Sequence, residues 1–376
     1  MRHLILLAIV VTAVGAAPRS AAAYPQYQLS RDQTCTGCHI APAGGGLLNE
    51  NGLATAESTS QFGTAPEFFY GKVPSPGWLT LGGDLRGAGG YIQTPQPAGA
   101  AFPMQADLYA HAAFGPISVQ VTFGPRSPTE GNEAATYVWS REHYLMYRQN
   151  PDENTGLYIR AGRFMPVVGL RFAEHPMYTR RYGGTQLYTE TYGAAIEYID
   201  QKAEVHVTGF IPDPVIDNVE NAAGAAAYGE LRLSETFSIG ALGMFKNTDD
   251  DQKIHAGITS KLYLSGPDLL FQLEVQFVNQ LVKETPTNPD GGAPKGIVGN
   301  LVASKMLTDW LLLDVGIGHY DSNLRIKNLD RDCVDLNLHW FATSHLEIAL
   351  NARYELIGFG DSDPGAYALL QGHYRL

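Results

Sequence analysis

An alternation of apolar and polar residues recurs from residue 77 to the C-terminus and constrains the fold more than any other feature. It is clearest over residues 269–277, 334–340 and 346–356, where polar side chains gather on one face. Side chains alternate between the two faces of a strand, so a period of two predicts β-strands with one polar and one apolar face. Turn residues separate the repeats, and we expect this part of the chain to be all-β.

The first 23 residues have the pattern of a cleavable secretory signal peptide. Met1–His3 is basic, an apolar run extends from Leu4 to Ala17, and small residues end at Ala23. The apolar run is too short to cross a bilayer comfortably, which disfavours an uncleaved anchor. The mature protein is therefore expected to be exported and to begin after Ala23.

The alternation fits either a soluble β-sandwich or a membrane barrel, because the pattern alone does not say which face is the core. The export signal and the number of long strands favour lipid on the outside. No later segment offers a continuous apolar run of helical transmembrane length. A membrane-spanning form must then be a closed barrel. We expect residues 77–376 to form a transmembrane antiparallel β-barrel in the lipid of the bacterial outer membrane.

About sixteen strands are expected, with fourteen or eighteen as alternatives. Short turns are predicted near residues 115, 200, 235, 266, 309 and 344, and longer loops near Pro97, Pro128, His175, Val215, Asp250, Asn288, Asn328 and Asp361. Short periplasmic turns and longer outer loops are typical of outer-membrane barrels. The chain enters its first strand from the short-turn side and its last strand returns there, so the number must be even. A barrel of this size encloses a lumen.

Composition excludes two other organisations. The chain has three cysteines, of which two share one motif and Cys333 is left single, so no disulfide framework holds the fold. The formal net charge is −12, which argues against a nucleic-acid partner.

Residues 35–39 read Cys-x-x-Cys-His, the attachment motif of a c-type haem. Cys35 and Cys38 could bond covalently to one porphyrin, and His39 would be the proximal iron ligand. The alternatives are a redox dithiol, a zinc site or a chance match to the motif. No βαβ pattern surrounds the motif, and no other Cys or His lies between Tyr24 and Phe102. We expect one covalent haem c.

Residues 24–76 form the expected haem-binding segment, which could plug the lumen. Gly44–Gly46 would let the backbone approach a flat cofactor. The carbonyl of Pro42 could accept the His39 Nδ1 hydrogen and orient the ligand, or Pro42 and the glycines could simply make a turn. Residues 74–77 read as the linker to the barrel.

The segment itself supplies no second axial ligand, so a six-coordinate haem would take one from the barrel. The longest outer loop, about residues 167–188, would narrow the lumen if it folded inward and would then bring His175 or Met177 near the haem. The candidates are His175, Met177, His111, His206, His339 and His373. Each histidine has the alternative of a lumen hydrogen-bonding role, an open sixth position stays possible, and Met146 and Met306 are expected to be packing residues.

Acidic residues cluster in the outer loops, at Asp249–Asp251, at Asp330 with Asp332, and at Asp361 with Asp363. Oxygen-rich clusters attract hard divalent cations and would concentrate a soluble metal donor. The alternative, which we favour, is a solvated polar loop.

The export signal, the single Cys-x-x-Cys-His, the Leu48–Gly52 stretch and a barrel of porin size resemble the fused monohaem cytochrome–porin proteins of bacterial outer membranes. The resemblance covers the whole architecture, and residues 35–52 by motif. It implies electron transfer across the outer membrane, with Fe(II) or another metal ion as an extracellular donor and periplasmic c-type cytochromes as acceptors. It also implies that Cys35 and Cys38 attach the haem and that His39 ligates it.

Two other functions remain open from the sequence. The barrel could be a diffusion porin whose haem is structural or gating, or a scaffold around multihaem cytochromes. For an electron carrier we expect no catalytic acid or base.

Overall fold

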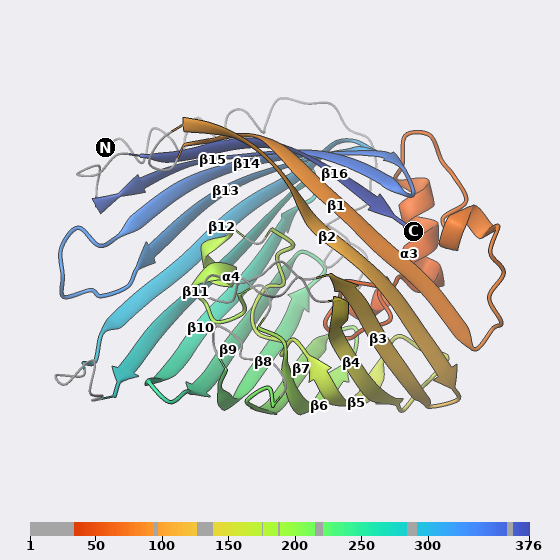
Figure 1. Ribbon diagram of the computed structural model, residues 1–376, viewed down its shortest axis with the longest axis horizontal. Coiled ribbons are helices and arrows are strands. Elements are labelled where there is room, and N and C mark those ends of the chain that lie inside the picture. The colour runs from red at the N-terminus through yellow and green to blue at the C-terminus, as the bar shows by residue number, and fades with distance from the viewer. Residues whose placement is uncertain are drawn as a thin grey trace.

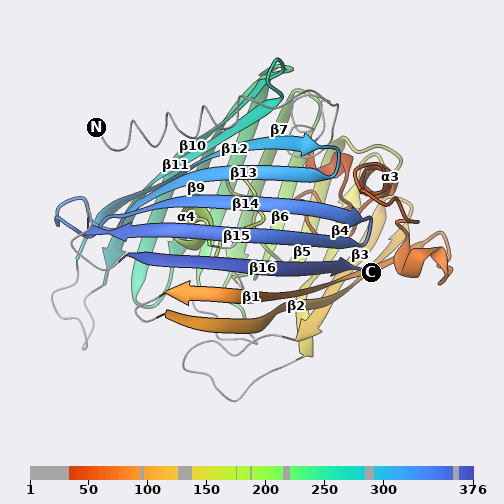
Figure 2. The same ribbon diagram turned by 90° about the horizontal axis from the view of Figure 1, so that it is seen from above.

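The computed structural model describes residues 34–93, 97–125, 138–174, 176–186, 189–214, 221–283, 292–358 and 364–376. These residues form a closed antiparallel barrel, shown from the side in Figure 1 and from above in Figure 2. The expected signal peptide, the start of the haem segment, His175, Asp361 and Asp363 lie outside the described residues.

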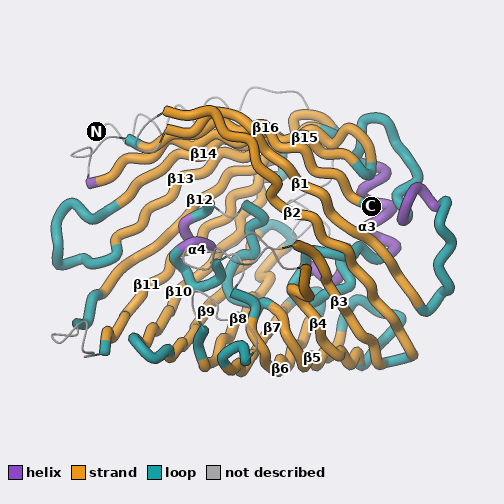
Figure 3. The backbone as a smooth tube through the Cα atoms, in the orientation of Figure 1, coloured by secondary structure: helices purple, strands orange, loops and turns teal. Residues whose placement is uncertain are grey.

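Sixteen strands can be assigned within the described residues. Each strand pairs with its neighbours in sequence, and β1 pairs with β16 to close the ring, as the backbone trace in Figure 3 shows. The prediction of about sixteen strands in a closed barrel is therefore confirmed. The strands are β1 Leu79–Gln93, β2 Pro97–Phe114, β3 Ile117–Pro125, β4 Val138–Arg148, β5 Gly156–Phe164, β6 Thr191–Ile199, β7 Ala203–Ile211, β8 Ala223–Ser234, β9 Phe237–Asn247, β10 Asp251–Leu264, β11 Leu269–Val282, β12 Lys295–Thr308, β13 Leu311–Asp321, β14 Arg331–Thr343, β15 Leu346–Ile357 and β16 Gly365–Arg375.

The helical segments are short: η1 Cys35–Gly37, α3 Glu50–Ser58, η2 Phe68–Gly71 and α4 Tyr178–Arg181. Helix α3 begins where the side chain of Asn49 accepts a hydrogen bond from the Gly52 amide, a typical N-cap. Within the described ranges, no helix has the length and apolarity that a membrane crossing requires.

The two ends of the barrel differ in their connections. All six short turns predicted from the sequence are found at one end, which we call the short-turn end. The longest loop, residues 165–190, belongs to the opposite end. Two connections expected to be long are short, because β2 begins at Pro97 soon after Gln93 and β10 begins at Asp251 soon after Asn247. The turn-forming residues predicted the positions of these hairpins correctly, but they did not predict that strand pairing extends almost to the turn itself.

Polar side chains face the lumen and apolar side chains face outward. On β14, Asp335 is 4% exposed whereas Leu336 is 42% exposed. On β11, Glu274 is 2% exposed and Phe277 is 43% exposed. A soluble barrel has the opposite arrangement, and a transmembrane barrel has this one. The sequence left the choice of face open, and the structure decides it in favour of lipid outside.

Helix α3, in the described part of the N-terminal segment, lies at the short-turn end beside the C-terminus (Figure 1). The amide of Gln61 donates to the carbonyl of Phe341 over 2.9 Å, and the hydroxyls of Tyr70 and Tyr374 are 3.0 Å apart. These contacts fix residues 60–70 against the turns and strand ends of β14–β16. The chain then turns into β1 at Leu79, where the barrel begins.

Candidate functional site

The Cys-x-x-Cys-His motif is wound into a single tight turn. Residues Cys35–Gly37 form the 3₁₀ helix η1, and the amide of His39 donates to the carbonyl of Cys35 over 2.8 Å. Neither motif cysteine forms a disulfide within the described part of the chain. One turn of backbone therefore holds two thiols and an imidazole close together, as covalent attachment of a planar group requires.

Helix α3 fastens this turn. The Asn49 side chain donates to the carbonyl of Thr36 over 2.8 Å, and the Asn51 side chain donates to that of Gly37, also over 2.8 Å. Gly52 packs directly on the motif, because a Cβ built there would collide with the carbonyl oxygen of Cys38. The Asn-x-x-Gly sequence at residues 49–52 thus has a structural role in holding the motif.

Contacts to the barrel wall place the motif within the short-turn end of the lumen. The Thr36 hydroxyl donates to the carbonyl of Asn154, in the connection between β4 and β5, over 2.6 Å. Ile40 packs against a buried cluster that includes Tyr144 and Met146 of β4. Leu47 is buried against β1, where a Cβ at Gly82 would lie only 2.6 Å from its Cδ2. Because Gly82 has no side chain, Leu47 of the motif segment can pack directly against β1.

Gly44–Gly46 turns the chain back beneath the motif. All three glycines have positive φ angles, between 59° and 76°, which side chains of other residues rarely adopt. A Cβ at Gly44 would lie 3.4 Å from the Cys35 sulfur and 3.9 Å from the His39 ring. The glycines thus make a tight turn against Cys35 and His39, and the expected approach to a flat cofactor stays a prediction.

Burial governs the protonation of the motif. Desolvation raises the pKa of the Cys35 thiol, partly opposed by the charge of Arg171, and also raises the pKa of the Cys38 thiol. Burial, assisted by the charge of Arg375, lowers the pKa of His39 to about 4. At neutral pH the imidazole is therefore uncharged, which is the form that can ligate a metal.

The carbonyl of Pro42 has a different partner from the one expected. Arg171 Nη1 donates to it over 3.4 Å, and Arg171 Nη2 also pairs with Glu204 Oε1 over 2.6 Å. The His39 Nδ1 atom is buried and has no hydrogen-bond partner among the described residues. Sequence reasoning missed Arg171, because it arrives from a loop far along the chain.

The described residues of that loop, which lies between β5 and β6, enter the lumen. The amide of Leu170 donates to Glu274 over 2.6 Å, and the amide of Thr179 donates to Asn300 over 2.8 Å. Both acceptors are lumen-facing residues of the wall, on β11 and β12 respectively. The loop therefore narrows the lumen and meets the motif segment through Arg171.

The candidates for a second axial ligand are dispersed. Met177 packs with Leu170, Phe172 and Val302. Met146 and Met306 lie in buried apolar clusters, as expected of packing residues. The four wall histidines are buried: His111, His206, His339 and His373.

Three of those histidines have carboxylate partners. His206 Nδ1 lies 3.0 Å from Glu197, and His339 Nδ1 lies 2.7 Å from Glu347. His373 lies between Glu347, at 3.1 Å, and Asp84, at 2.8 Å. Asp84 is also one of the charges that act on His39. Through Asp84, His373 is therefore linked indirectly to His39 of the motif.

Some of the acidic residues expected in the outer loops have protein partners. Asp251 accepts hydrogen bonds from Thr248 and Gln280, and Asp332 pairs with His319 over 2.9 Å. Asp330 is buried, and its Oδ2 atom has no hydrogen-bond partner among the described residues. The choice between solvated polar loops and cation sites stays a prediction.

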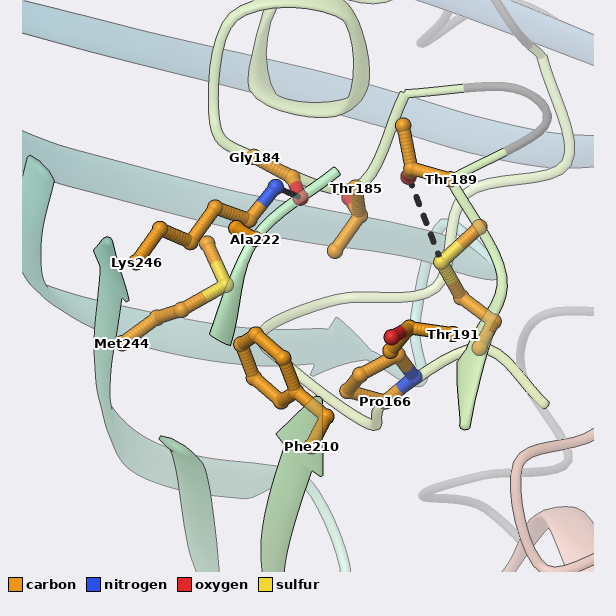
Figure 4. A pocket seen from close by; sticks show the side chains of 10 residues that line it. Pro166, Gly184, Thr185, Thr189, Thr191, Phe210, Ala222, Met244 and Lys246 are labelled. Atoms are coloured by element: carbon orange, nitrogen blue, oxygen red, sulfur yellow. Dashed lines mark hydrogen bonds between the residues drawn. The ribbon is translucent and has the colours of Figure 1, made fainter. Parts of the chain in front are cut away.

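A pocket lies between the long loop and the wall of β7–β9 (Figure 4). Its lining includes Met165, Phe210 and Met244, and the Lys246 ammonium donates to the carbonyl of Gly184 over 2.7 Å. None of the three motif residues lines it. This pocket therefore belongs to the packing of the loop and is separate from the candidate site.

Solved structures share this architecture. The outer-membrane OmpT of Vibrio cholerae matches with a TM-score of 0.60 at 13% identity, over 81% of this chain and 100% of that chain. The anion-selective porin from Comamonas acidovorans matches with a TM-score of 0.60 at 8% identity, over 79% and 99%. The chain has the fold of an outer-membrane porin. The DcaP channel of Acinetobacter baumannii has the same fold, with a TM-score of 0.56 at 11% identity, over 79% and 97%.

The porin likeness concerns the fold alone, because all these identities are low. No family profile and no curated protein matches the sequence. The function must therefore be argued from the residues that this chain places inside its barrel.

Those residues fit a covalently attached haem. Two cysteines that form no disulfide and a neutral imidazole share one turn, and the buried His39 Nδ1 has no hydrogen-bond partner among the described residues. Gly44 has a φ of +76°, which other residues rarely adopt, and its backbone lies in contact distance of Cys35 and His39. The donor set is the one that c-type haem attachment needs.

Proposed function

We propose that this protein carries electrons across the bacterial outer membrane by one covalent c-type haem held in a porin-type barrel. Cys35 and Cys38 would attach the haem and His39 would ligate its iron, which supplies one-electron chemistry. The observation that carries the proposal is the winding of all three residues, each half-buried, into one tight turn inside the lumen. We infer export by a cleaved signal peptide, with the short-turn end in the periplasm.

The surroundings of the motif suit an electron carrier. Its half-buried setting limits solvent access, and solvent access together with the axial ligand and nearby charge sets a haem potential. The position at the short-turn end favours exchange with periplasmic cytochromes. On the opposite side, the donor would be an extracellular metal ion such as Fe(II), or another redox partner.

Haem attachment is tested first. Protein from cells competent in c-type haem maturation is expected to keep its haem absorption after denaturation and acid–acetone extraction. The Cys35→Ser/Cys38→Ser variant should lose it, whereas Cys333→Ser, a matched substitution of the remaining cysteine, should keep it. Loss of haem from wild-type protein on extraction would contradict covalent attachment.

Electron transfer is tested in sealed vesicles with the haem-loaded protein. Fe(II) added outside should reduce the haem, and an oxidised cytochrome c enclosed in the vesicle should then be reduced. Haem that is present but never reduced from outside would eliminate Fe(II) as donor, and a panel of other reductants would follow.

Diffusion is the second candidate function, favoured by the likeness to the Comamonas anion-selective porin. Planar-bilayer conductance separates the two. A conductance typical of an open porin, unchanged in the Cys35→Ser/Cys38→Ser variant, would favour diffusion. A scaffold role would instead require co-purification with periplasmic multihaem cytochromes.

A further inference from the structure

A histidine and two carboxylates converge inside the lumen, away from the cysteine motif. His339 of β14 and Asp314 of β13 are on neighbouring strands, and Glu174 comes from the long loop. His339 Nε2 is 3.5 Å from Asp314 Oδ2 and 3.8 Å from Glu174 Oε1. One ligand atom from each residue lies within 4.8 Å of the others.

These separations suit a metal ion. Ligand atoms about 2.1 Å from a tetrahedral ion lie about 3.4 Å from one another, and somewhat different values arise in other geometries. The observed gaps are too long for good hydrogen bonds and close to that spacing. His339 is 8% exposed, and its Nε2 atom has no hydrogen-bond partner among the described residues. This buried nitrogen therefore points at two carboxylates without bonding to either.

The other ring nitrogen is oriented as in known metal sites. His339 Nδ1 lies 2.7 Å from Glu347, whose second oxygen lies 3.1 Å from His373. A carboxylate that accepts the Nδ1 hydrogen leaves the Nε2 lone pair free for a metal. Glu347 thus places the ligand nitrogen toward Asp314 and Glu174.

The local charge calls for a cation. Three carboxylates, of Glu174, Asp314 and Glu347, surround one imidazole. Within the described part of the chain, the only ion pairs recorded for Glu174 and Asp314 are those with His339. Arg180, on the same loop as Glu174, donates instead to the carbonyl of Phe172.

A similar group elsewhere on the wall shows the contrast. His206 lies between Glu197 and Glu204, but Arg160 forms a bidentate pair with Glu197 and Arg171 pairs with Glu204. Arginines neutralise those carboxylates, so no metal is needed there.

We propose that Glu174, Asp314 and His339 bind one divalent first-row transition-metal ion, which ties the long loop to the barrel wall. A mixed nitrogen and oxygen donor set suits Zn²⁺, Mn²⁺ or Fe²⁺. A pocket at the short-turn end, lined in part by Glu347 and His373, gives access to the neighbourhood of this site. The site does not depend on haem at Cys35 and Cys38.

The test uses full-length protein purified from outer membranes and stripped with EDTA. Mn²⁺ is titrated in while the electron paramagnetic resonance signal of free Mn²⁺ is followed, and Zn²⁺ then competes. Wild type should bind one equivalent with micromolar or tighter affinity. His339→Gln and Glu174→Gln should each weaken binding about tenfold or more. Asp332→Asn, which removes the half-buried carboxylate partner of His319, should bind like wild type.

Folding of every variant is checked by heat-modifiable migration in gels. Glu174 lies outside the strands, so its variant tests the site even if a wall substitution prevents barrel formation. The Cys35→Ser/Cys38→Ser variant should bind Mn²⁺ normally, which separates this proposal from the haem. Absence of a tight equivalent in wild type, or unchanged binding in folded Glu174→Gln, would overturn the proposal.

Discussion

Gly52 shows how one missing side chain determines the geometry of the candidate site. It lies in the first turn of α3, against the carbonyl of Cys38, where a Cβ cannot fit. The side chains of Asn49 and Asn51, which precede Gly52, donate hydrogen bonds to the carbonyls of Thr36 and Gly37, respectively. The helix and the motif therefore behave as one packed unit.

Replacing Gly52 with alanine should loosen this unit. In an unconstrained helix the change would be favourable by about 1 kcal/mol, but the collision reverses the sign, with an expected cost of about 1–3 kcal/mol. We expect a lower yield of attached haem and faster hydrogen exchange over residues 35–52. Gly63→Ala, at a position with open space around its Cβ, is the control and should leave both unchanged.

The pKa of His39 predicts how acid affects the segment before haem is attached. Burial lowers the pKa from the ordinary 6.5 to about 4, so between these values the exposed form of the segment takes up a proton that the docked form does not. Docking is therefore fully stable above about pH 6.5 and weakens as pH falls toward 4. Hydrogen-exchange protection of residues 35–48 in haem-free protein, corrected for intrinsic rates, should fall accordingly. His39→Gln should remove this part of the pH dependence, and an identical profile in that variant would contradict the assignment.

At the scale of elements, strand positions were predictable and loop contacts were not. The alternation over residues 269–277, 334–340 and 346–356 located β11, β14 and β15 because side-chain period is a local property. Ion pairs inside the lumen, such as that of Arg171 with Glu204, join a residue of the long loop to a residue of the barrel wall. No local sequence pattern encodes such contacts. For the same reason, the sequence analysis did not identify Glu174 or Asp314, whereas it singled out His339 as a possible metal ligand.

Arg171 is expected to hold the long loop against both the wall and the motif segment. In Arg171→Leu, Glu204, which is 1% exposed, would lose its cationic partner, at an expected cost of about 3–5 kcal/mol. The variant should unfold at a lower temperature than wild type. The double variant Arg171→Leu/Glu204→Leu should regain part of that loss, because no carboxylate remains buried without a partner. Additive effects of the two substitutions would show that the pair does not interact.

At the scale of the whole molecule, the outward apolar surface and the occupied lumen define what the barrel can do. Leu370, near the middle of β16, is 58% exposed on the outer face. Leu370→Arg should cost about 2–4 kcal/mol in folding into lipid vesicles. Leu324→Arg, at a similarly exposed position in the loop between β13 and β14, should cost little. Equal effects in refolding titrations would contradict the membrane placement.

The occupied lumen predicts low conductance. Residues 165–190 bond to wall positions on β11 and β12, and the motif segment lies at the short-turn end. Wild-type protein in planar bilayers should conduct far less than an open sixteen-stranded porin. Replacing residues 167–188 with a short Gly–Ser linker should raise conductance several-fold. An unchanged conductance would show that the loop does not restrict passage.

The seam between β1 and β16 joins the first and the last strand of the barrel. The amide of Leu376 donates to the carbonyl of Gly83 over 2.8 Å, and His373 and Arg375 approach Asp84, a neighbour of the motif. Residues 373–376 thus complete the surroundings of Gly83 and Asp84. Deleting residues 372–376 would remove both the contact with Gly83 and the charges beside Asp84, so the shortened chain should close its ring less stably.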